Sequence, residues 1–438
     1  MIGDGLIIVV IGLFVTRLTG DPRDVGVVLA AYVLPLVLFL LVGGVIADRL
    51  PRQAVMVTAD LIRAMLHGTL ALLIALGAVR IWYMVVIGLL FGTSQAFFEP
   101  AYTGLVPQTV PEAGIQQAQA LNGVSRELAA FVSPALATAL VFSVGGAAAF
   151  ALDAATFAIS AATLSRVRAR ARGQAAVRGT LFGELREGWT AVRERSWVWA
   201  TIAAFAMALL VALAPFFVLG PAVSRQVYGT EAVFGIINAF WGAGTVTGAV
   251  IGARWRPRRP ILAGLLVSII WPGQIALFAA GPSTALLYPA TALAGLGLGL
   301  FGVWWETALA ERIPAHLLSR VSAWDLMGSL GLLPLGYLLA GPVAAALGEP
   351  EVLIGGGMIG MAVMTLALLP RSIWTLGLVD EFAQLTVEGG QPGCLPADRE
   401  PVVELEGERD AVERESRAPG DGPFAGLSSR SGCAVAGQ

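Results

Sequence analysis

Residues 25–52 read VGVVLAAYVLPLVLFLLVGGVIADRLPR, an uncharged apolar run that ends in two glycines, an Asp-Arg pair and a further arginine. The run at 25–46 is long enough to cross the hydrocarbon layer of a bilayer, which takes about 20 residues of helix. Backbone groups find no water to bond inside lipid, so such a segment must be helical. The stretch therefore predicts a membrane helix followed by a short charged turn.

The composition extends this interpretation to most of the chain. Its 438 residues are 56% hydrophobic and only 13% charged, whereas soluble domains have about 25% charged residues. This much apolar surface exceeds what one water-soluble core can bury, so we expect a bilayer to cover the rest. The sequence holds twelve apolar runs of about spanning length, at 5–19, 25–46, 54–78, 81–104, 118–142, 145–164, 198–219, 232–253, 260–280, 284–305, 321–345 and 352–370.

The first run, 5–19, is short, and Asp4 lies just before it in the same apolar sequence. No basic segment precedes this run, so the pattern is not that of a secretory signal. We expect the first helix to begin upstream of Met1, with up to about a dozen of its residues missing.

The arginines are distributed unequally between the connecting loops. Cytoplasmic loops of membrane proteins carry an excess of basic residues. With the N-terminus inside, the cytoplasmic links hold many arginines, and the external links hold only Arg17, Arg23, Arg80 and Arg225. We therefore expect a multi-pass protein of the cell inner membrane with both termini in the cytoplasm. The cytoplasmic set is Arg49, Arg52, Arg126, Arg254, Arg256, Arg258, Arg259, Arg312, Arg320 and the arginines of the central loop.

A motif that occurs twice indicates an internal repeat. Phe97-Phe98-Glu99 is followed by Val106-Pro107, and 207 residues later Trp304-Trp305-Glu306 is followed by Ile313-Pro314. Parallel six-helix repeats are typical of one class of secondary transporter. We predict four parts: a six-helix bundle at 1–164, a cytoplasmic linker with an amphipathic helix at 165–197, a second bundle at 198–371 and a disordered cytoplasmic tail at 372–438.

The turn after the second span has the residues of a conformational latch. Gly43 and Gly44 allow two helices to approach closely, and Asp48 lies at a helix end, where it can pair with an arginine or with a helix N-terminus. Arg49 and Arg52 complete the charged set. An alternative is that the arginines only anchor the loop at the membrane surface.

This loop resembles the signature loop of the major facilitator superfamily. The resemblance implies an all-α membrane protein with twelve transmembrane helices in two six-helix repeats, which rock about a midplane site. Further motifs resemble the drug-antiporter subfamily that contains macrolide-efflux and enterobactin-export proteins. They are Asp60-Leu61-Ile62-Arg63-Ala64, Pro100-Ala101, Leu105-Val106-Pro107, Gln119-Ala120-Leu121-Asn122-Gly123, Leu152-Asp153-Ala154-Ala155-Thr156-Phe157 and Glu184-Leu185-Arg186-Glu187-Gly188.

One element departs from that family pattern. Antiporters of the superfamily often carry a Gly-Pro-x-x-Gly-Gly element in the fifth span, whereas this chain reads Ser133-Pro134-Ala135-Leu136-Ala137. The proline remains, so we expect a helix bend at Pro134. Export as the direction of transport therefore rests on the subfamily resemblance.

Four carboxylates lie in or near predicted spans, where an ionisable group is costly and usually faces a cavity or another charged group. They are Asp4, Glu99, Glu306 and Asp153, and we expect proton coupling or gating from among them. Glu99 and Glu306 occupy equivalent positions in the two repeats. The alternative to proton coupling is a structural role, in which they pair with the latch arginines. A cap or interface role near the outer end of the sixth span is the alternative for Asp153.

Aromatic side chains can line an apolar cavity for lipophilic ligands. Most aromatic residues of such a protein instead pack against helices or face lipid, so each is a weak signal on its own. The cavity candidates are Phe240, Trp241, Trp271, Trp304 and Trp305.

Several classes of function lack their residues in this sequence. Cys394, Cys433, His67 and His316 are the only cysteines and histidines, and their spacing predicts neither a metal site nor a disulfide framework. No P-loop motif indicates ATP binding, and no nucleophile-base pair indicates an enzyme. We expect no cofactor and no nucleic-acid partner.

The sequence therefore predicts a secondary transporter, acting as a monomer, that exports small lipophilic or amphipathic molecules in exchange for protons. An importer or symporter of the same fold is one alternative. A membrane protein that does not transport, either a sensor or a truncated remnant, is another.

Overall fold

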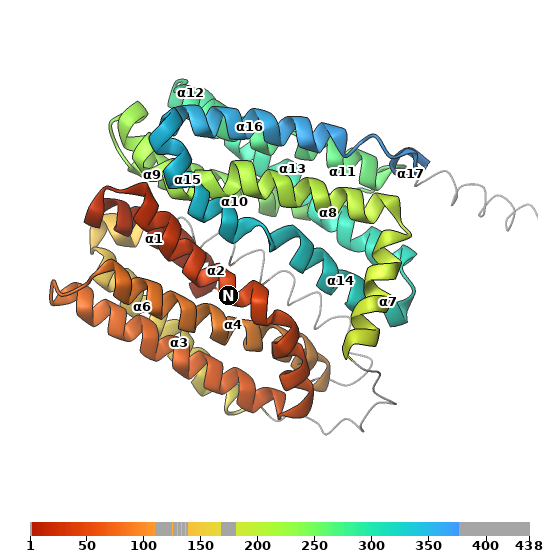
Figure 1. Ribbon diagram of the computed structural model, residues 1–438, viewed down its shortest axis with the longest axis horizontal. Coiled ribbons are helices and arrows are strands. Elements are labelled where there is room, and N and C mark those ends of the chain that lie inside the picture. Colours follow the sequence, from red (N-terminus) through yellow and green to blue (C-terminus); the bar gives the residue numbers. More distant parts are fainter. Residues whose placement is uncertain are drawn as a thin grey trace, which may run out of the picture. The chain divides into compact units, whose positions relative to one another are not determined.

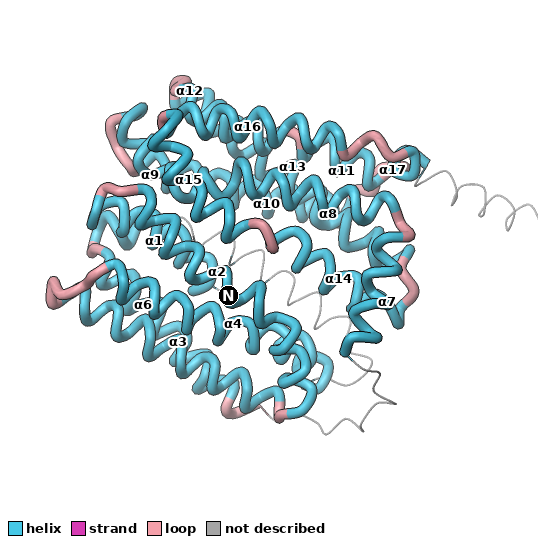
Figure 2. The backbone as a smooth tube through the Cα atoms, viewed as in Figure 1, coloured by secondary structure: helices cyan, strands magenta, loops and turns pink. Residues whose placement is uncertain are grey.

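The computed structural model of the protein describes residues 2–109, 139–167 and 181–375, together with residues 125, 129, 133 and 136. Within these ranges every regular element is a helix (Figure 2), as the apolar runs predict. The described residues belong to one unit, Met1–Ala383. The predicted tail lies outside them except for its first residues, which end the short helix α17 (Arg371–Thr375).

The first group of described helices corresponds to the predicted spans before residue 165, shown red to yellow in Figure 1. The chain reverses after the first helix at Gly20, whose φ of 72° is left-handed and therefore favours glycine. The predicted span at 118–142 lies mostly outside the described residues. The group consists of α1 (Ile2–Thr19), α2 (Pro22–Arg49), α3 (Arg52–Ala75), α4 (Ile81–Thr109) and α6 (Gly146–Leu164).

The second group, green to blue in Figure 1, begins after the linker helix α7 (Leu181–Arg193). Each predicted span from 198–219 to 352–370 overlaps one helix or two or three consecutive helices. The group consists of α8 (Ser196–Ala208), η2 (Leu209–Leu213), α9 (Ala214–Tyr228), α10 (Ala232–Arg254), α11 (Pro260–Ser268), α12 (Ile270–Ala280), α13 (Thr284–Arg312), α14 (Ala315–Leu330), α15 (Leu333–Leu347) and α16 (Glu349–Leu366).

Prolines explain two of the irregular points within these spans. Pro272 has no N–H to donate to the carbonyl of Ser268, and the helix is interrupted between the two residues, where α11 ends and α12 begins. Pro215 follows the π-helical turn Leu209–Leu213, which widens the helix between α8 and α9. Each pair nevertheless continues as one apolar segment, at Pro260–Ala280 and Ser196–Tyr228.

Ten of the described helical segments are long and apolar enough to cross a membrane, and Ile7–Thr19 is a shorter apolar helix. These eleven helices correspond to eleven of the twelve predicted crossings, and the remaining predicted span, 118–142, lies mostly outside the described residues. The fold is therefore an all-α multi-pass membrane fold, as the sequence predicts.

Glycines bring two helix pairs into backbone contact at equivalent places. A Cβ atom on Gly92 of α4 would lie 2.1 Å from the carbonyl oxygen of Tyr32 on α2. A Cβ atom on Gly299 of α13 would lie 2.0 Å from the carbonyl oxygen of Thr245 on α10. Gly92 and Gly299 are 207 residues apart, the separation of the duplicated motif. The same close helix approach therefore recurs in both groups.

The linker helix α7 packs against α14. The rings of Trp189 and Trp324 lie 5.0 Å apart, a Cβ atom on Gly188 would lie 2.9 Å from Trp324, and Arg320 forms an ion pair with Glu187. The linker is thus attached to the second group of helices by aromatic and charged contacts.

Candidate functional site

The two groups of helices touch mainly through α1 and α2 on one side and α9 and α15 on the other. A Cβ atom on Gly26 would lie 2.2 Å from the carbonyl oxygen of Tyr337, and one on Gly341 would lie 2.9 Å from Cα of Arg23. These contacts lie where α1 ends and α10 begins, which we call the Glu231 end. The opposite end, where α3 begins, we call the Arg52 end.

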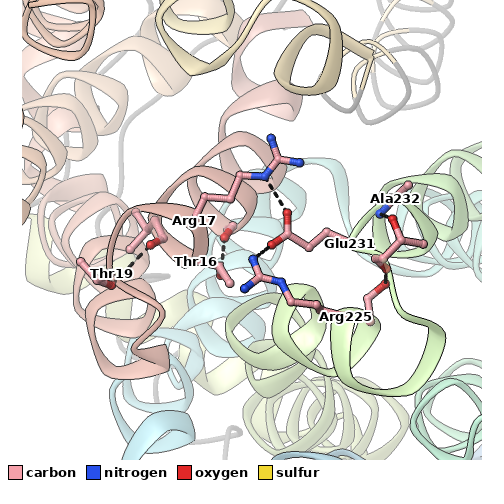
Figure 3. A network of polar contacts seen from close by, with 10 residues as sticks. Thr16, Arg17, Thr19, Arg225, Glu231 and Ala232 are labelled. Atoms are coloured by element: carbon pink, nitrogen blue, oxygen red, sulfur yellow. Dashed lines mark hydrogen bonds and ion pairs between the residues drawn. The ribbon is translucent and has the colours of Figure 1, made fainter. Parts of the chain in front are cut away.

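A cluster of two arginines and one carboxylate reinforces the Glu231 end (Figure 3). Glu231, just before α10, is 5% exposed and accepts a hydrogen bond from Nε of Arg17 at 2.6 Å. It also pairs with Arg225 of α9. The guanidinium of Arg17 lies 4.2 Å from the ring centre of Phe142. We call Arg17, Arg225 and Glu231 the Glu231 clamp, and it joins the two groups through Arg17.

Farther toward the Arg52 end, a pocket separates the two groups. It has a volume of about 220 Å³ and a mostly apolar wall. Glu99 on α4 is half-buried in that wall, and Leu36 lies midway along α2. We call this cavity the Glu99 pocket, lined by Leu36, Val37, Leu40, Gln95, Glu99, Leu326, Met327 and Leu330.

The other three carboxylates predicted from the sequence occupy different environments. Glu306, the repeat partner of Glu99, is exposed on α13. Asp153 is buried on α6 and pairs with His67; α6 has no side-chain cap, so Asp153 does not cap it. Asp4 lies in α1, and its side chain is not among those described.

The structure describes the surroundings of only two residues of the predicted latch, Gly43 and Arg52. Gly43 is buried in α2, where an added Cβ atom would lie 2.1 Å from the carbonyl oxygen of Ala96 on α4. This close approach agrees with the predicted reason for a glycine. Arg52 opens α3 and is half-buried. The surroundings of Gly44 and the side chains of Asp48 and Arg49 are not among the described features, and Pro134 lies outside the described residues.

Two of the predicted cavity tryptophans use their ring N–H groups in helix packing. Trp304 donates to the carbonyl oxygen of Trp255 at 3.1 Å, and Trp305 donates to Oδ2 of Asp325 at 2.8 Å. Both rings are almost fully buried. Their contacts fix α13 against neighbouring helices, and neither ring lines the Glu99 pocket.

The remaining three aromatic candidates lie elsewhere in the second group. Trp271 is 1% exposed, and its ring centre lies 6.2 Å from that of Trp241. Phe240 is 38% exposed and stacks on Tyr288 at 5.0 Å. None of the three lines the Glu99 pocket.

The sequence interpretation missed a buried polar cluster around His67, between α2, α3 and α6. His67 was considered only as a metal ligand. Within the described residues no group of three potential ligands could hold a metal ion. The signal that could have found the cluster is the spacing of Asp60, Arg63 and His67, which places three ionisable groups on one face of an apolar helix.

Comparisons with known proteins agree with this architecture. The sequence profile described as Major Facilitator Superfamily matches residues 1–333. Macrolide efflux protein A of Streptococcus pyogenes is 26% identical over 346 residues, which cover 76% of this chain and 84% of that protein. Multidrug efflux pump Tap of Mycolicibacterium fortuitum is 25% identical over 361 residues, which cover 79% of this chain and 87% of the pump.

Solved structures of transporters share the fold at low sequence identity. The nucleoside transporter NupG superposes with a TM-score of 0.67 and 15% identity, covering 84% of this chain and 95% of the transporter. A D-xylose-proton symporter superposes with a TM-score of 0.64 and 12% identity, covering 85% of this chain and 96% of the symporter. At such identities the likeness establishes the fold alone.

Proposed function

The chain belongs to the major facilitator superfamily of transporters, and we propose that it is a proton-driven exporter of small lipophilic or amphipathic molecules. The observation that carries this proposal is the asymmetry between the two ends of the helix groups. Backbone contacts and the Glu231 clamp close one end, while the Glu99 pocket lies between the groups farther along. A transporter in one of its two access states has this arrangement.

We assign the two ends to the two sides of the membrane by their arginines. We propose that the Arg52 end and both termini face the cytoplasm, because the links predicted to be cytoplasmic carry most of the arginines of the chain. In this orientation the Glu231 end faces outward and is shut. We propose that this is the inward-accessible state of an inner-membrane protein that acts as a monomer.

The Glu99 pocket has the chemistry expected for a lipophilic substrate. Its wall is largely apolar, with Gln95 and Glu99 as its polar members. A volume of about 220 Å³ is below the roughly 300 Å³ at which drug-sized pockets begin, so the pocket can hold part of such a molecule. We propose that Glu99 contacts the substrate or the coupling proton, with Glu306 as its counterpart in the second repeat.

The direction of transport is proposed from the relatives. Two relatives that align with most of the chain are named for macrolide efflux and multidrug efflux, whereas a structural neighbour is named as a proton symporter. Sequence relatives share more with this chain than structural neighbours at 12–15% identity do. Export is therefore the proposed direction, and symport by the same fold is the second candidate.

We further propose that closure alternates between the ends. The Glu231 clamp holds the outer end shut in the present state. When it opens, the predicted latch of Gly43, Gly44, Asp48, Arg49 and Arg52 would hold the inner end. Such reciprocal closure lets two groups of helices rock about one site without opening a continuous channel.

The test is accumulation of lipophilic dyes and antibiotics, including erythromycin and ethidium, in a host that lacks its own efflux pumps. We expect lower accumulation in cells that express the protein, and we expect a protonophore to abolish the difference. Glu99→Gln should reduce efflux, whereas the same change at Glu351, an exposed carboxylate on α16, should not. Unchanged accumulation of every probe, with the protein present in the membrane, would contradict the proposal.

A further inference from the structure

Four ionisable side chains meet in the buried interior of the first helix group. Asp60, Arg63 and His67 lie on α3, Asp153 faces them from α6, and each is at most 1% exposed. Arg63 donates to one oxygen of Asp60 at 2.7 Å, and Ser160 donates to the other at 2.6 Å. Charged groups are rare in membrane helices because they are costly there, so a cluster of four indicates a function.

His67 is held on several sides. Its Nδ1 contacts Oδ2 of Asp153, and its Nε2 lies 3.2 Å from the hydroxyl oxygen of Tyr32 on α2. From α4 the ring of Phe91 stacks on the imidazole at 4.4 Å, and from α6 the ring of Phe157 approaches to 6.1 Å. Apart from the two charged groups on α3, the titratable groups that face His67 among the described residues are therefore Asp153 and Tyr32.

The His67–Asp153 pair is electrically neutral when it holds one proton more than a neutral imidazole beside an ionised carboxylate. Asp60 and Arg63 neutralise each other. A neutral imidazole beside an ionised Asp153 gives the pair a net charge of −1, whereas one added proton gives a neutral pair. In addition, Oδ1 of Asp153 is buried and has no hydrogen-bond partner among the described residues, so these residues compensate the carboxylate charge incompletely. A buried net charge is strongly unfavourable, so loss of the proton requires water to reach the cluster.

The helix that carries Tyr32 connects this cluster to the moving parts of the transporter. Leu36 lies one helical turn after Tyr32 on α2 and lines the Glu99 pocket. Earlier on the same helix, Gly26 touches the backbone of Tyr337 across the two groups. A change in the hydration or charge of the cluster can therefore shift α2 relative to both the pocket and the closed end.

We propose that His67 and Asp153 together bind the proton that drives transport, at a site separate from the substrate pocket. The pair takes a proton from water on one side of the membrane and returns it to water on the other, and no other bond changes. The hydroxyl of Tyr32 can donate to a neutral Nε2 or accept from a protonated one, so it serves either state. This inference rests on the proposed proton-driven function.

The first test separates proton coupling from substrate movement in membrane vesicles. Radiolabelled erythromycin is followed in two modes, as accumulation driven by an imposed pH gradient and as exchange at equal concentrations without a gradient. We expect His67→Gln and Asp153→Asn each to lose gradient-driven accumulation and to keep exchange, because exchange needs the substrate site alone. Retained exchange also shows that the variants are folded. Glu351→Gln is the matched control and should keep both modes.

The possible outcomes distinguish failure of the proposed proton site from failure of the proposed proton-driven function. If the wild-type protein accumulates erythromycin with the gradient and both variants do so equally well, the proton site is refuted and the proposed function stands. If the wild-type protein shows exchange but no dependence on the gradient, the proton-driven function fails and the proton site fails with it. Loss of the gradient-driven mode alone in both variants supports the inference.

A second measurement does not depend on transport or on the stability of the His67 variant. The chain has two histidines, so His316→Gln protein with isotope-labelled histidine reports on His67 alone by magnetic resonance. Across the range of about pH 5 to 8 we expect the ring signals of His67 to change with proton binding, and we expect Asp153→Asn to alter that change. Ring signals that stay in one state across this range, with and without that substitution, would overturn the proposal.

Discussion

Replacing Glu231 by glutamine tests the clamp that closes one end of the transporter. Arg225 and Glu231 belong to the same helix group, so within the clamp the contact that links the two groups is the one between Arg17 and Glu231, at 2.6 Å. Arg17 is 36% exposed, so solvent weakens this pair. The substitution should therefore reduce the stability of the closed state relative to the open state by about 1–2 kcal/mol. Breaking a fully buried pair would cost about 3–5 kcal/mol. The ratio of open to closed states should then rise roughly 5- to 30-fold.

The assay is thiol labelling of a cysteine placed at Val218, in protein whose two native cysteines have been replaced by serine. Val218 of α9 is fully buried, and its side chain lies near Gly26 across the closed end. In lipid nanodiscs we expect Glu231→Gln to raise the rate of thiol labelling roughly 5- to 30-fold. Glu311→Gln breaks an ion pair with Arg256 within one group and should leave the rate unchanged. Equal rates in the Glu231 variant and the parent would refute the role of the clamp.

Three further predictions concern packing and buried charge. Gly26→Ala places a Cβ atom about 2.2 Å from a backbone oxygen, so it should raise the same labelling rate; no increase would count against the contact. Gly92→Ala should lower the melting temperature of the protein. Gly302→Ala should not, because an added Cβ atom there meets nothing within 4 Å. Equal melting temperatures of the two variants would contradict the close approach at Gly92. Asp60→Asn should lower the free energy of unfolding, measured with denaturant, by about 3–5 kcal/mol. Adding Arg63→Met to this variant should recover part of the lost stability. An Asp60→Asn protein as stable as the wild type would refute the buried pairing.

Much of the fold could be predicted because lipid imposes simple requirements. A spanning helix must be apolar and about 20 residues long, so runs such as 54–78 and 284–305 matched α3 and α13 closely. The interruption before Pro272 was not predicted, although a proline in a helix removes a backbone hydrogen bond. The π-helical turn at Leu209–Leu213 was not predicted either, although Pro215 lies just after it in the sequence.

The candidate site was less predictable, because it depends on which helix faces meet. The duplicated motif indicated Glu99 and Glu306 equally, yet the structure places Glu99 in a pocket wall and Glu306 on an exposed surface. Asp153 was identified as a buried carboxylate, but its partner His67 lies 86 residues away in the sequence. No local pattern joins residues so far apart. Trp305, which the sequence predicts as a cavity residue, donates a hydrogen bond to Asp325, a residue that no motif connects with it.

The most direct test of the central claim uses purified protein in liposomes with an imposed pH gradient and no ATP. If the protein is a proton-driven exporter, erythromycin or ethidium should move against its concentration gradient and opposite to the flow of protons, and a protonophore should stop it. Movement in the same direction as the protons would indicate a symporter. Movement that ignores the gradient would contradict proton coupling altogether.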